Sequence, residues 1–368
     1  MDHKSDDPLD SEPDSSAPLF DVSGTKSLSA ELEAQRSIAA DAARPLFVRL
    51  EAFEDILETE VGDTPLLRAR NLERLHGLRQ IYLKFEGANP TGTQKDRIAF
   101  AQVRDALRRG FEDVTVASCG NYGAALAFAA SIAGLRCQVF IPRGYHTKRV
   151  RELEELTAEV TIAEGDYETV VKASQAHAQR HEIYDANPGG ENTPIQLRAY
   201  GEIAYEIYDE LRDSPAAVAV SVSNGTTLSG IYRGFLGLHR RGKISRFPRM
   251  VAGSSPNQNP IVRSYLNKSE RCDDLQPRRI HENSVNEPLI NWHSIDGQQA
   301  LDAIHLTKGW AAHASDRAMR ALARQLREQE GISVLPASTA GLHALLTRHK
   351  LSPLPGDRYV AVLTARLS

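Results

Sequence analysis

The organisation of the chain follows from one stretch, Lys84-Phe85-Glu86-Gly87-Ala88-Asn89-Pro90-Thr91-Gly92-Thr93-Gln94-Lys95-Asp96-Arg97. A short apolar strand ends in Gly, Asn and Pro, and a helix begins at Lys95, which places this lysine at a strand-to-helix turn. Neighbours that desolvate an amine, or add positive charge beside it, lower its pKa and let it form a Schiff base with a carbonyl compound. The stretch alone favours a covalent anchor and an ordinary helix-start lysine about equally.

Strands and helices alternate on both sides of this turn. Apolar, β-rich runs predict strands at Gln80–Phe85, Val114–Ala117, Cys137–Ile141, Val160–Ala163, Ile183–Asp185, Ala217–Val222, Val251–Gly253, Ile332–Leu335 and Tyr359–Leu363. Helical patterns are found at Lys95–Arg109, Asn121–Ala133, Lys148–Leu156, Tyr167–Arg180, Tyr200–Arg212, Ser229–Arg241, Ser315–Glu328 and Thr339–Lys350. Such alternation with short connections predicts an α/β protein with parallel sheets.

Length, charge and cysteine content narrow the class of protein. A chain of 368 residues is long for one core, so two lobes are expected. A formal net charge of -4 without a long basic stripe argues against nucleic acid as a partner. The apolar runs are too short for a membrane span. Three cysteines without paired spacing favour a reducing compartment and hence a cytoplasmic protein.

Two further features concern segments outside the alternating pattern. Residues 1–26 are rich in Asp, Ser and Pro, and we expect a disordered acidic tail there. His177 and His181 lie four apart on a predicted helix, but no third ligand is near. A solvated helix face is therefore favoured over a metal site, and no metal is expected.

A second glycine-containing turn follows the strand at Val114–Ala117. It reads Ser118-Cys119-Gly120-Asn121-Tyr122-Gly123 and leads into a helix. The N-terminus of a helix presents backbone N–H groups and a positive dipole end, which suit a carboxylate or phosphate. A Ser- or Asn-capped helix start without any ligand fits the same residues. Cys119 is either a reactive thiol or a small buried filler, and the second is favoured.

Two later strands also end in small polar residues. Ala217–Val222 leads into Ser223-Asn224-Gly225-Thr226-Thr227, where small residues let backbone amides close around a phosphate. The last strand ends at Thr364, whose hydroxyl lies just past an apolar run. Taken alone, a threonine at the end of a strand is structural.

Together these motifs resemble those of the fold type II pyridoxal 5'-phosphate (PLP) enzymes, and of threonine synthases in particular. The segment Asn89–Arg97 resembles their PLP-lysine motif, and Gly62–Leu67 resembles their Gly-x-Thr-Pro-Leu segment. The likeness runs from Gly62 to Thr364 with the order and spacing of the motifs kept. It implies a two-lobed fold with parallel or mixed sheets flanked by helices. Residues 27–90 and 215–368 would form a large PLP-binding domain, and 91–214 a smaller mobile domain, in a homodimer.

The resemblance also implies roles for individual residues. Lys95 would form the Schiff base with PLP and later act as the base, Asn121 would bind the 3'-oxygen, and Thr364 would bind the ring nitrogen. The phosphate would be bound by five consecutive residues, Ser223, Asn224, Gly225, Thr226 and Thr227. The amino-acid substrate would be bound by Ser118, Cys119, Gly120 and Tyr122.

Several positions depart from the family pattern. Ser223 and Thr226 stand where relatives usually have glycine, and Ala365-Arg366-Leu367 replaces Gly-His-Gly. Threonine synthases bind the phosphate of O-phosphohomoserine with a Thr, an Asn and an Arg, whose places here correspond to Tyr122, Tyr184 and Gly190. Losing a bidentate arginine disfavours a dianionic substrate, unless Arg198 substitutes for it.

The sequence therefore predicts a PLP-dependent lyase or synthase that carries out β- or γ-elimination or replacement on an amino acid. Threonine synthase-like activity is the first hypothesis. The alternatives are a β-replacement synthase resembling cysteine or cysteate synthases, and a serine/threonine dehydratase-like lyase. A PLP-binding protein that has lost turnover and regulates a partner through its acidic tail is the non-enzymatic alternative.

Overall fold

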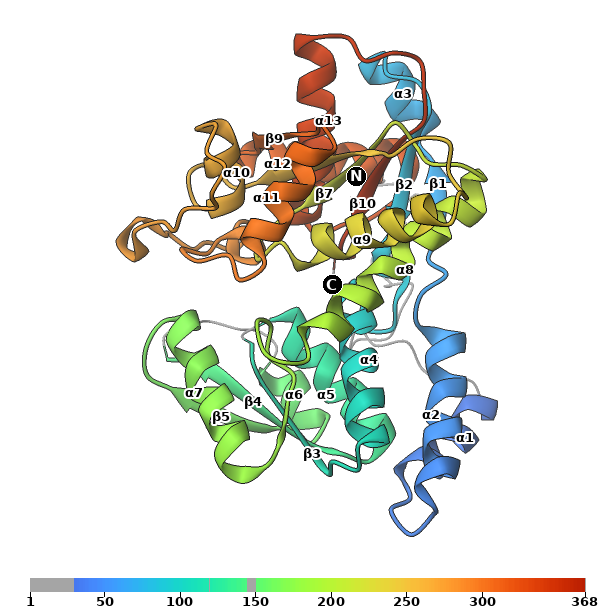
Figure 1. The fold of residues 1–368 in the computed structure, drawn as a ribbon, viewed down its shortest axis with the longest axis vertical. Helices are drawn as coiled ribbons and strands as arrows, with labels where there is room; N and C mark the ends of the chain where they lie inside the picture. The colour runs from blue at the N-terminus through green and yellow to red at the C-terminus, as the bar shows by residue number, and fades with distance from the viewer. Residues whose placement is uncertain (1–29, 119, 144–149, 368) are drawn as a thin grey trace, which may run out of the picture.

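The computed structural model describes residues 30–118, 120–143 and 150–367, which form two sheets flanked by helices (Figure 1). The larger sheet has the order β1-β2-β10-β7-β8-β9, and only the β1–β2 pair is antiparallel. Its strands are Leu66–Arg68, Ile81–Phe85, Tyr359–Leu363, Ala217–Ser221, Arg249–Ser254 and Trp310–His313, in that spatial order. The smaller, fully parallel sheet has the order β5-β4-β3-β6, with strands Glu159–Ala163, Arg136–Pro142, Asp113–Ala117 and Tyr184–Asp185. The predicted α/β class is confirmed.

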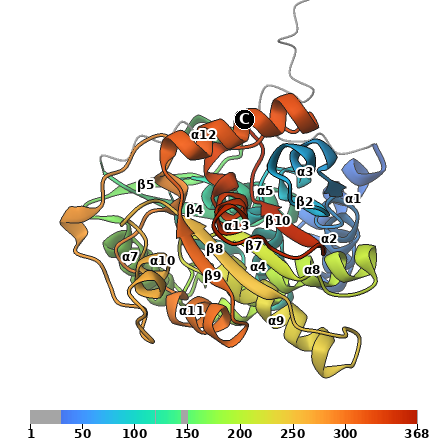
Figure 2. The same ribbon diagram turned by 90° about the horizontal axis from the view of Figure 1, so that it is seen from above.

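Both faces of the larger sheet are buried, as its uninterrupted apolar strands require. In β7 every residue is buried, and the side chains alternate between two cores. Val218 and Val220 pack with residues of α8 (Thr193–Leu211), α9 (Thr226–Arg240) and α11 (Gly297–Leu306). Ala217 and Ala219 pack with α13 (Ala340–Leu351) on the opposite face. Figure 2 shows the larger sheet with these helices around it.

The smaller sheet follows the same rule with other helices. Val114 and Val116 of β3 face the core formed with α4 (Lys95–Arg108) and α5 (Asn121–Ala133). Ala117 faces α7 (Tyr167–His181) on the other side. The N-terminal helices α1 (Ala30–Ala40) and α2 (Leu46–Glu60) pack against α5 and α4.

The remaining elements are short. They are the helices α3 (Arg70–His76), α6 (Val150–Glu155), α10 (Pro260–Leu266) and α12 (Asp316–Gln325), the π-helical turn Leu326–Glu330, and the 3-10 turns Glu86–Ala88, Pro277–Arg279, Glu287–Leu289 and Pro336–Thr339. No helix in the described ranges is long and apolar enough to cross a membrane.

Three predicted elements differ from the structure. The predicted strand Ile332–Leu335 is wrong, because only Val334 makes a single bridge, to Arg366, before Pro336 begins a 3-10 turn. Helix α8 begins at Thr193 rather than at Tyr200, since a proline in the first turn is compatible with a helix. Helix α9 begins at Thr226 rather than at Ser229. The predicted tail 1–26 and the start of the helix predicted at Lys148 lie outside the described residues.

Candidate active site

A cavity of about 400 Å³ lies where the carboxyl ends of strands from both sheets meet. Its wall includes Ser118 after β3, Ser223 after β7 and Thr364 after β10. The carboxyl ends of parallel strands are the usual position of a ligand site in an α/β protein, and the volume suits a small cofactor. Among the residues predicted for the site, the cavity is lined by Lys95, Ser118, Gly120, Asn121, Tyr122, Ser223, Asn224, Gly225, Thr226, Thr227 and Thr364. Cys119 lies outside the described residues.

Lys95 is the first residue of α4, and its side chain lines the cavity. Its backbone N–H donates to Thr93 Oγ1 at 3.1 Å, which fixes the start of the helix. Its Nζ lies 5.8 Å from the ring centre of Tyr122 and 6.0 Å from that of Tyr200. Burial lowers the pKa of the amine to about 8, against the opposing charge of Glu287. The amine is therefore neutral, and nucleophilic, over a much wider pH range than an exposed lysine.

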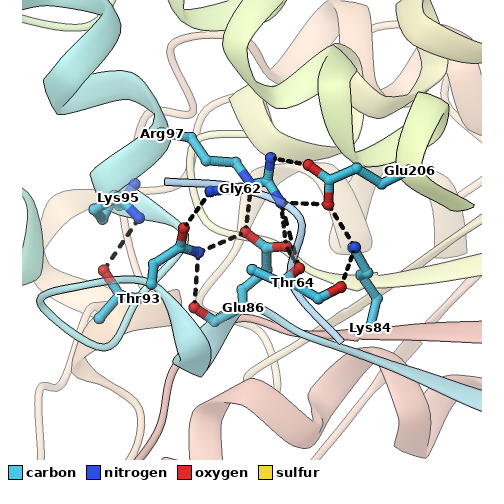
Figure 3. A network of polar contacts seen from close by, with 9 residues as sticks. Gly62, Thr64, Lys84, Glu86, Thr93, Lys95, Arg97 and Glu206 are labelled. Atoms are coloured by element: carbon cyan, nitrogen blue, oxygen red, sulfur yellow. Dashed lines mark hydrogen bonds and ion pairs between the residues drawn. The ribbon is translucent and has the colours of Figure 1, made fainter. Parts of the chain in front are cut away.

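Behind the start of α4 lies a buried ion cluster formed by Lys84, Glu86, Arg97 and Glu206 (Figure 3). Arg97 binds Glu86 through Nε at 2.6 Å and Nη2 at 2.9 Å, and binds Glu206 through Nη1 at 2.6 Å and Nη2 at 2.8 Å. Glu206 also pairs with Lys84. Burial alone would raise the pKa of Glu206, but Arg97 and Lys84 lower it to about 2. Two cations thus face two carboxylates inside the protein.

The same cluster holds the segment Gly62–Leu67 against the lysine turn. Thr64 Oγ1 donates to Glu86 at 2.7 Å, and the Thr64 carbonyl accepts from Lys84 Nζ. The Gly62 N–H donates to Asn89 Oδ1 at 3.0 Å, and Asn89 Nδ2 donates to Glu86 (Figure 3). These hydrogen bonds explain how the Gly-x-Thr-Pro segment is held next to the lysine motif in the folded protein.

The loop after β3 supplies a helix N-terminus to the cavity. Ser118 Oγ accepts from the backbone N–H groups of Gly120 at 3.3 Å and Gly123 at 3.0 Å, and Asn121 begins α5. The Tyr122 hydroxyl donates to the Ala186 carbonyl at 2.7 Å, so its ring forms a fixed wall of the cavity. Ser118, two residues before the N-cap Gly120, thus accepts a backbone N–H of the first turn of α5 and also lines the cavity.

The loop after β7 supplies a second helix N-terminus, and neighbouring segments brace it. Gly225 has φ +91°, and a Cβ there would lie 2.9 Å from the Asp296 carbonyl, so the turn requires glycine. The Ser223 carbonyl accepts from Asn259 Nδ2 at 2.9 Å, and Thr226 Oγ1 donates to Asp296. The loop therefore accommodates Ser223 and Thr226 at the positions where glycine was expected, because Gly225 still provides the positive φ of the turn.

Thr364 lies at the far end of the same cavity. Its hydroxyl donates to Ser338 Oγ at 3.1 Å, and the backbone N–H of Ala365 donates to the same oxygen at 3.0 Å. Thr364 is 9% exposed, and its carbonyl accepts from the Gln94 N–H at 2.9 Å. The residue next to Lys95 is thus bound directly to the end of the last strand.

Three residues considered for a substrate phosphate do not line the cavity. Tyr184 is buried elsewhere, where its hydroxyl donates to Gln102 Oε1 at 2.6 Å and to Asp105 Oδ2 at 3.0 Å. Gly190 is not part of the wall either, and Arg198, the proposed substitute, is exposed. The suggestion that Arg198 takes over phosphate binding is therefore wrong for this structure.

Sequence reasoning missed part of the cavity wall. The missed residues come from the loop before α7 and from the irregular region around 277–292, and include Asp166, Glu168, Glu282, Glu287 and Trp292. Trp292 Nε1 donates to Asp166 Oδ2 at 3.1 Å, which joins the two segments. Asp166 could have been found as a helix cap, but nothing in the sequence brings the irregular region to the cavity. The described residues hold no cluster of three or more potential metal ligands.

Comparisons with known proteins agree with this geometry. Residues 57–365 match the sequence pattern of the family described as "Pyridoxal-phosphate dependent enzyme". A threonine synthase of Methanocaldococcus jannaschii is 33% identical over 290 residues, covering 77% of this chain and 70% of that protein. A threonine synthase of Methanosarcina acetivorans is 28% identical, covering 82% and 74%.

Solved structures show the same fold. Serine racemase from Dictyostelium discoideum superposes with a TM-score of 0.68 at 17% identity, covering 87% of this chain and 97% of that one. Processed threonine deaminase isoform 2 from Solanum lycopersicum gives 0.69 at 14% identity, covering 94% and 92%. The family match and the 33% identical relative, together with the lysine cavity, show that the chain belongs to the pyridoxal-phosphate-dependent enzymes and is a threonine synthase-like member of them.

Proposed function

We propose that the chain catalyses β- or γ-elimination or replacement on an amino acid, with PLP bound covalently to Lys95. One observation carries this proposal: an enclosed amine with a pKa of about 8 lines a cavity to which two helix N-termini and the Thr364 hydroxyl also contribute. An amine, anion-binding helix starts and a neutral hydroxyl are the donor set that an aldehyde, a phosphate and a pyridine nitrogen require.

The residues of this chain fit the parts of the cofactor as follows. Lys95 would bind the aldehyde carbon, and Asn121 the 3'-oxygen. The loop Ser223–Thr227 would hold the phosphate, because its backbone N–H groups begin α9 and the helix dipole favours negative charge. Thr364 would face the ring nitrogen with its hydroxyl, whose one proton would turn from Ser338 Oγ to the nitrogen and donate a hydrogen bond without supplying a full positive charge.

When bound, PLP supplies a ring that accepts the electron pair released at Cα of the amino acid. The amine of Lys95, once displaced by the substrate amine, would remove the Cα proton as general base, and its pKa of about 8 makes a larger fraction of it neutral near pH 7 than for an exposed lysine. The Ser118–Tyr122 loop would orient the substrate carboxylate at the N-terminus of α5. A leaving group at Cβ would then depart with the electron pair of its own bond as the Cα electron pair forms the Cα–Cβ double bond. A leaving group at Cγ would depart only after a second proton has been removed from Cβ.

The relatives favour threonine formation from O-phosphohomoserine as the first activity to test. The cavity wall favours a second candidate, because Tyr184, Gly190 and Arg198 do not line it. Under that candidate the substrate is an amino acid without a phosphate, as in dehydratase-like elimination or in β-replacement by cysteine or cysteate synthase-like enzymes. Product analysis with phosphohomoserine, phosphoserine, acetylserine, serine and threonine separates these activities.

Borohydride reduction followed by peptide mapping tests the assignment of Lys95. We expect a pyridoxyl label on the peptide that contains Lys95, and a Lys95→Ala variant that keeps its fold but loses both the label and turnover. A label on another lysine, or full turnover without Lys95, would overturn the proposal. A label on Lys95 without spectral change for any amino acid would instead indicate the non-enzymatic regulator.

The assembly and the domain motion are also proposals. We infer a homodimer in which residues 91–214 form a smaller domain that closes over the substrate, opposite a larger domain of residues 27–90 and 215–368. The separate sheets support this division, since the smaller one takes its strands from between Asp113 and Asp185. Cys137 and Cys272 are free thiols, which agrees with a cytoplasmic location. Sedimentation, and small-angle scattering with and without substrate, test the dimer and the closure.

A further inference from the structure

The segment that follows β10 is hydrogen-bonded to the turn that precedes Lys95. Arg366 donates from Nη1 to the carbonyls of Gly87 at 3.1 Å and Asn89 at 3.2 Å, and from Nη2 to that of Pro90 at 3.1 Å. One guanidinium thus binds three carbonyls of a single turn. A rigid planar donor with five N–H groups is suited to such a site.

Backbone contacts join the same two segments. The Arg366 N–H donates to the Gly92 carbonyl at 2.9 Å, and Thr93 bridges Ala365. Gly92 has φ +85°, and a Cβ there would lie between 2.6 and 2.9 Å from atoms of the Arg366 side chain. The turn is therefore shaped to admit the arginine, and any larger residue at position 92 would displace it.

Asp96 also binds this turn. Its Oδ2 accepts from the Thr91 N–H at 3.0 Å, and its Oδ1 accepts from Thr91 Oγ1 at 2.7 Å. The carboxylate is fully buried. The turn is therefore bound both by a guanidinium, through its carbonyls, and by the carboxyl group of Asp96, through the N–H and hydroxyl of Thr91.

We propose that Arg366 is a positioning residue that fixes the spacing between Lys95 and Thr364. The inference rests on the proposed function, in which Lys95 binds one end of the cofactor ring and Thr364 binds the other. A planar ring cannot adapt its length, so a shift of one contact relative to the other weakens both. Lys95 follows the turn 87–93, which Arg366 binds, by two residues, and Thr364 lies two residues before Arg366 in the chain.

The test compares the holoenzymes of the wild type, Arg366→Met and Arg366→Lys. Arg240→Met, at the exposed end of α9, is the matched control. We expect Arg366→Met to weaken cofactor binding about tenfold or more, to shift the cofactor absorbance band, and to lower kcat with little change in the KM for the amino acid. We expect Arg366→Lys to recover part of the affinity, and Arg240→Met to match the wild type.

The outcomes separate this inference from the proposed function. If Arg366→Met retains wild-type cofactor affinity and absorbance while Lys95 carries the borohydride label, the positioning role is wrong and the proposed function stands. If the wild type is labelled at another residue, the proposed function itself fails. Should Arg366→Met not fold, Arg366→Lys decides: unchanged affinity and spectrum in that variant overturn the inference, and weakened binding at an unchanged apoenzyme melting temperature supports it.

Discussion

The two regions on either side of Lys95 differ in how their charges are compensated. In the buried ion cluster, Arg97 and Lys84 neutralise Glu86 and Glu206 within the protein. On the cavity side, the starts of α5 and α9 present helix N-termini to an open volume. The cluster pairs its charges within the chain, whereas the helix N-termini at the cavity favour a bound anion. The compensated charges of the ion cluster therefore contribute to the stability of the fold. The helix N-termini at the cavity contribute instead to ligand binding.

The largest effect is expected from breaking the cluster. Arg97→Met leaves two buried carboxylates without their shared cation, and should lower the free energy of unfolding by about 3–5 kcal/mol. Urea unfolding of the apoenzyme measures this change. Arg104→Met on the same helix removes only a surface contact of 4.0 Å to Glu54 and should change stability by less than about 1 kcal/mol. Equal changes in the free energy of unfolding for Arg97→Met and Arg104→Met would contradict the larger contribution assigned to the buried cluster.

Acid should weaken the cluster through Glu206. Its folded pKa of about 2 lies below the ordinary 4.5, so its stabilising contribution is present above pH 4.5 and is lost as the pH falls toward 2. The shift corresponds to about 3 kcal/mol of stability. Unfolding curves across this range should show a smaller acid dependence for Glu206→Gln. In Glu202→Gln the acid dependence of Glu206 should remain, because burial raises the Glu202 pKa instead.

On the cavity side, uptake of PLP by the apoenzyme should follow the protonation of Lys95. Its pKa of about 8 means that the neutral amine is the minor form below that pH and predominates above it. The uptake rate should therefore rise about tenfold per pH unit and level off above about pH 8. Glu287→Gln should shift the midpoint to lower pH, since the Glu287 charge raises this pKa. A rate that still rises at about pH 10 would indicate an exposed lysine instead.

The smallest effect is expected at the start of α5. Ser118→Ala removes the acceptor for the N–H groups of Gly120 and Gly123 and should cost about 1 kcal/mol of stability. It should also raise the KM for the amino acid, if the loop binds its carboxylate. Ser131→Ala, near the other end of the helix, is the control and should change neither quantity appreciably. An unchanged KM in Ser118→Ala would remove this serine from the substrate site.

Much of the larger architecture could be predicted from local patterns. Period and turn residues located the strands around Val114 and Ala217 and the helix that begins at Lys95 within one or two residues. They failed at Ile332–Leu335, where an apolar run packs as an irregular segment before Pro336. They also failed at the start of α8, because Pro194 was not recognised as a first-turn residue.

Likewise, only part of the site could be predicted from local sequence. Lys95, Asn121 and Thr364 follow the strands β2, β3 and β10, so local sequence could place them at the carboxyl ends of strands of the two sheets. Two other contacts join residues that are far apart in the chain. Arg97 pairs with Glu206, and Arg366 donates hydrogen bonds to the turn that precedes Lys95. Such contacts leave no periodic signal, and only the folded backbone reveals them.

The pairing of β2 with β10 has a consequence for the synthesis of the chain. Lys95 follows strand β2, while the strand that pairs with β2 spans Tyr359–Leu363 and is made much later in translation. Until that segment leaves the ribosome, the turn around Lys95 lacks its neighbour, and the nascent polypeptide exposes the edge of β2. We therefore expect loading with PLP to require the synthesis of β10, and ribosome-bound chains that end before Tyr359 to remain dependent on chaperones.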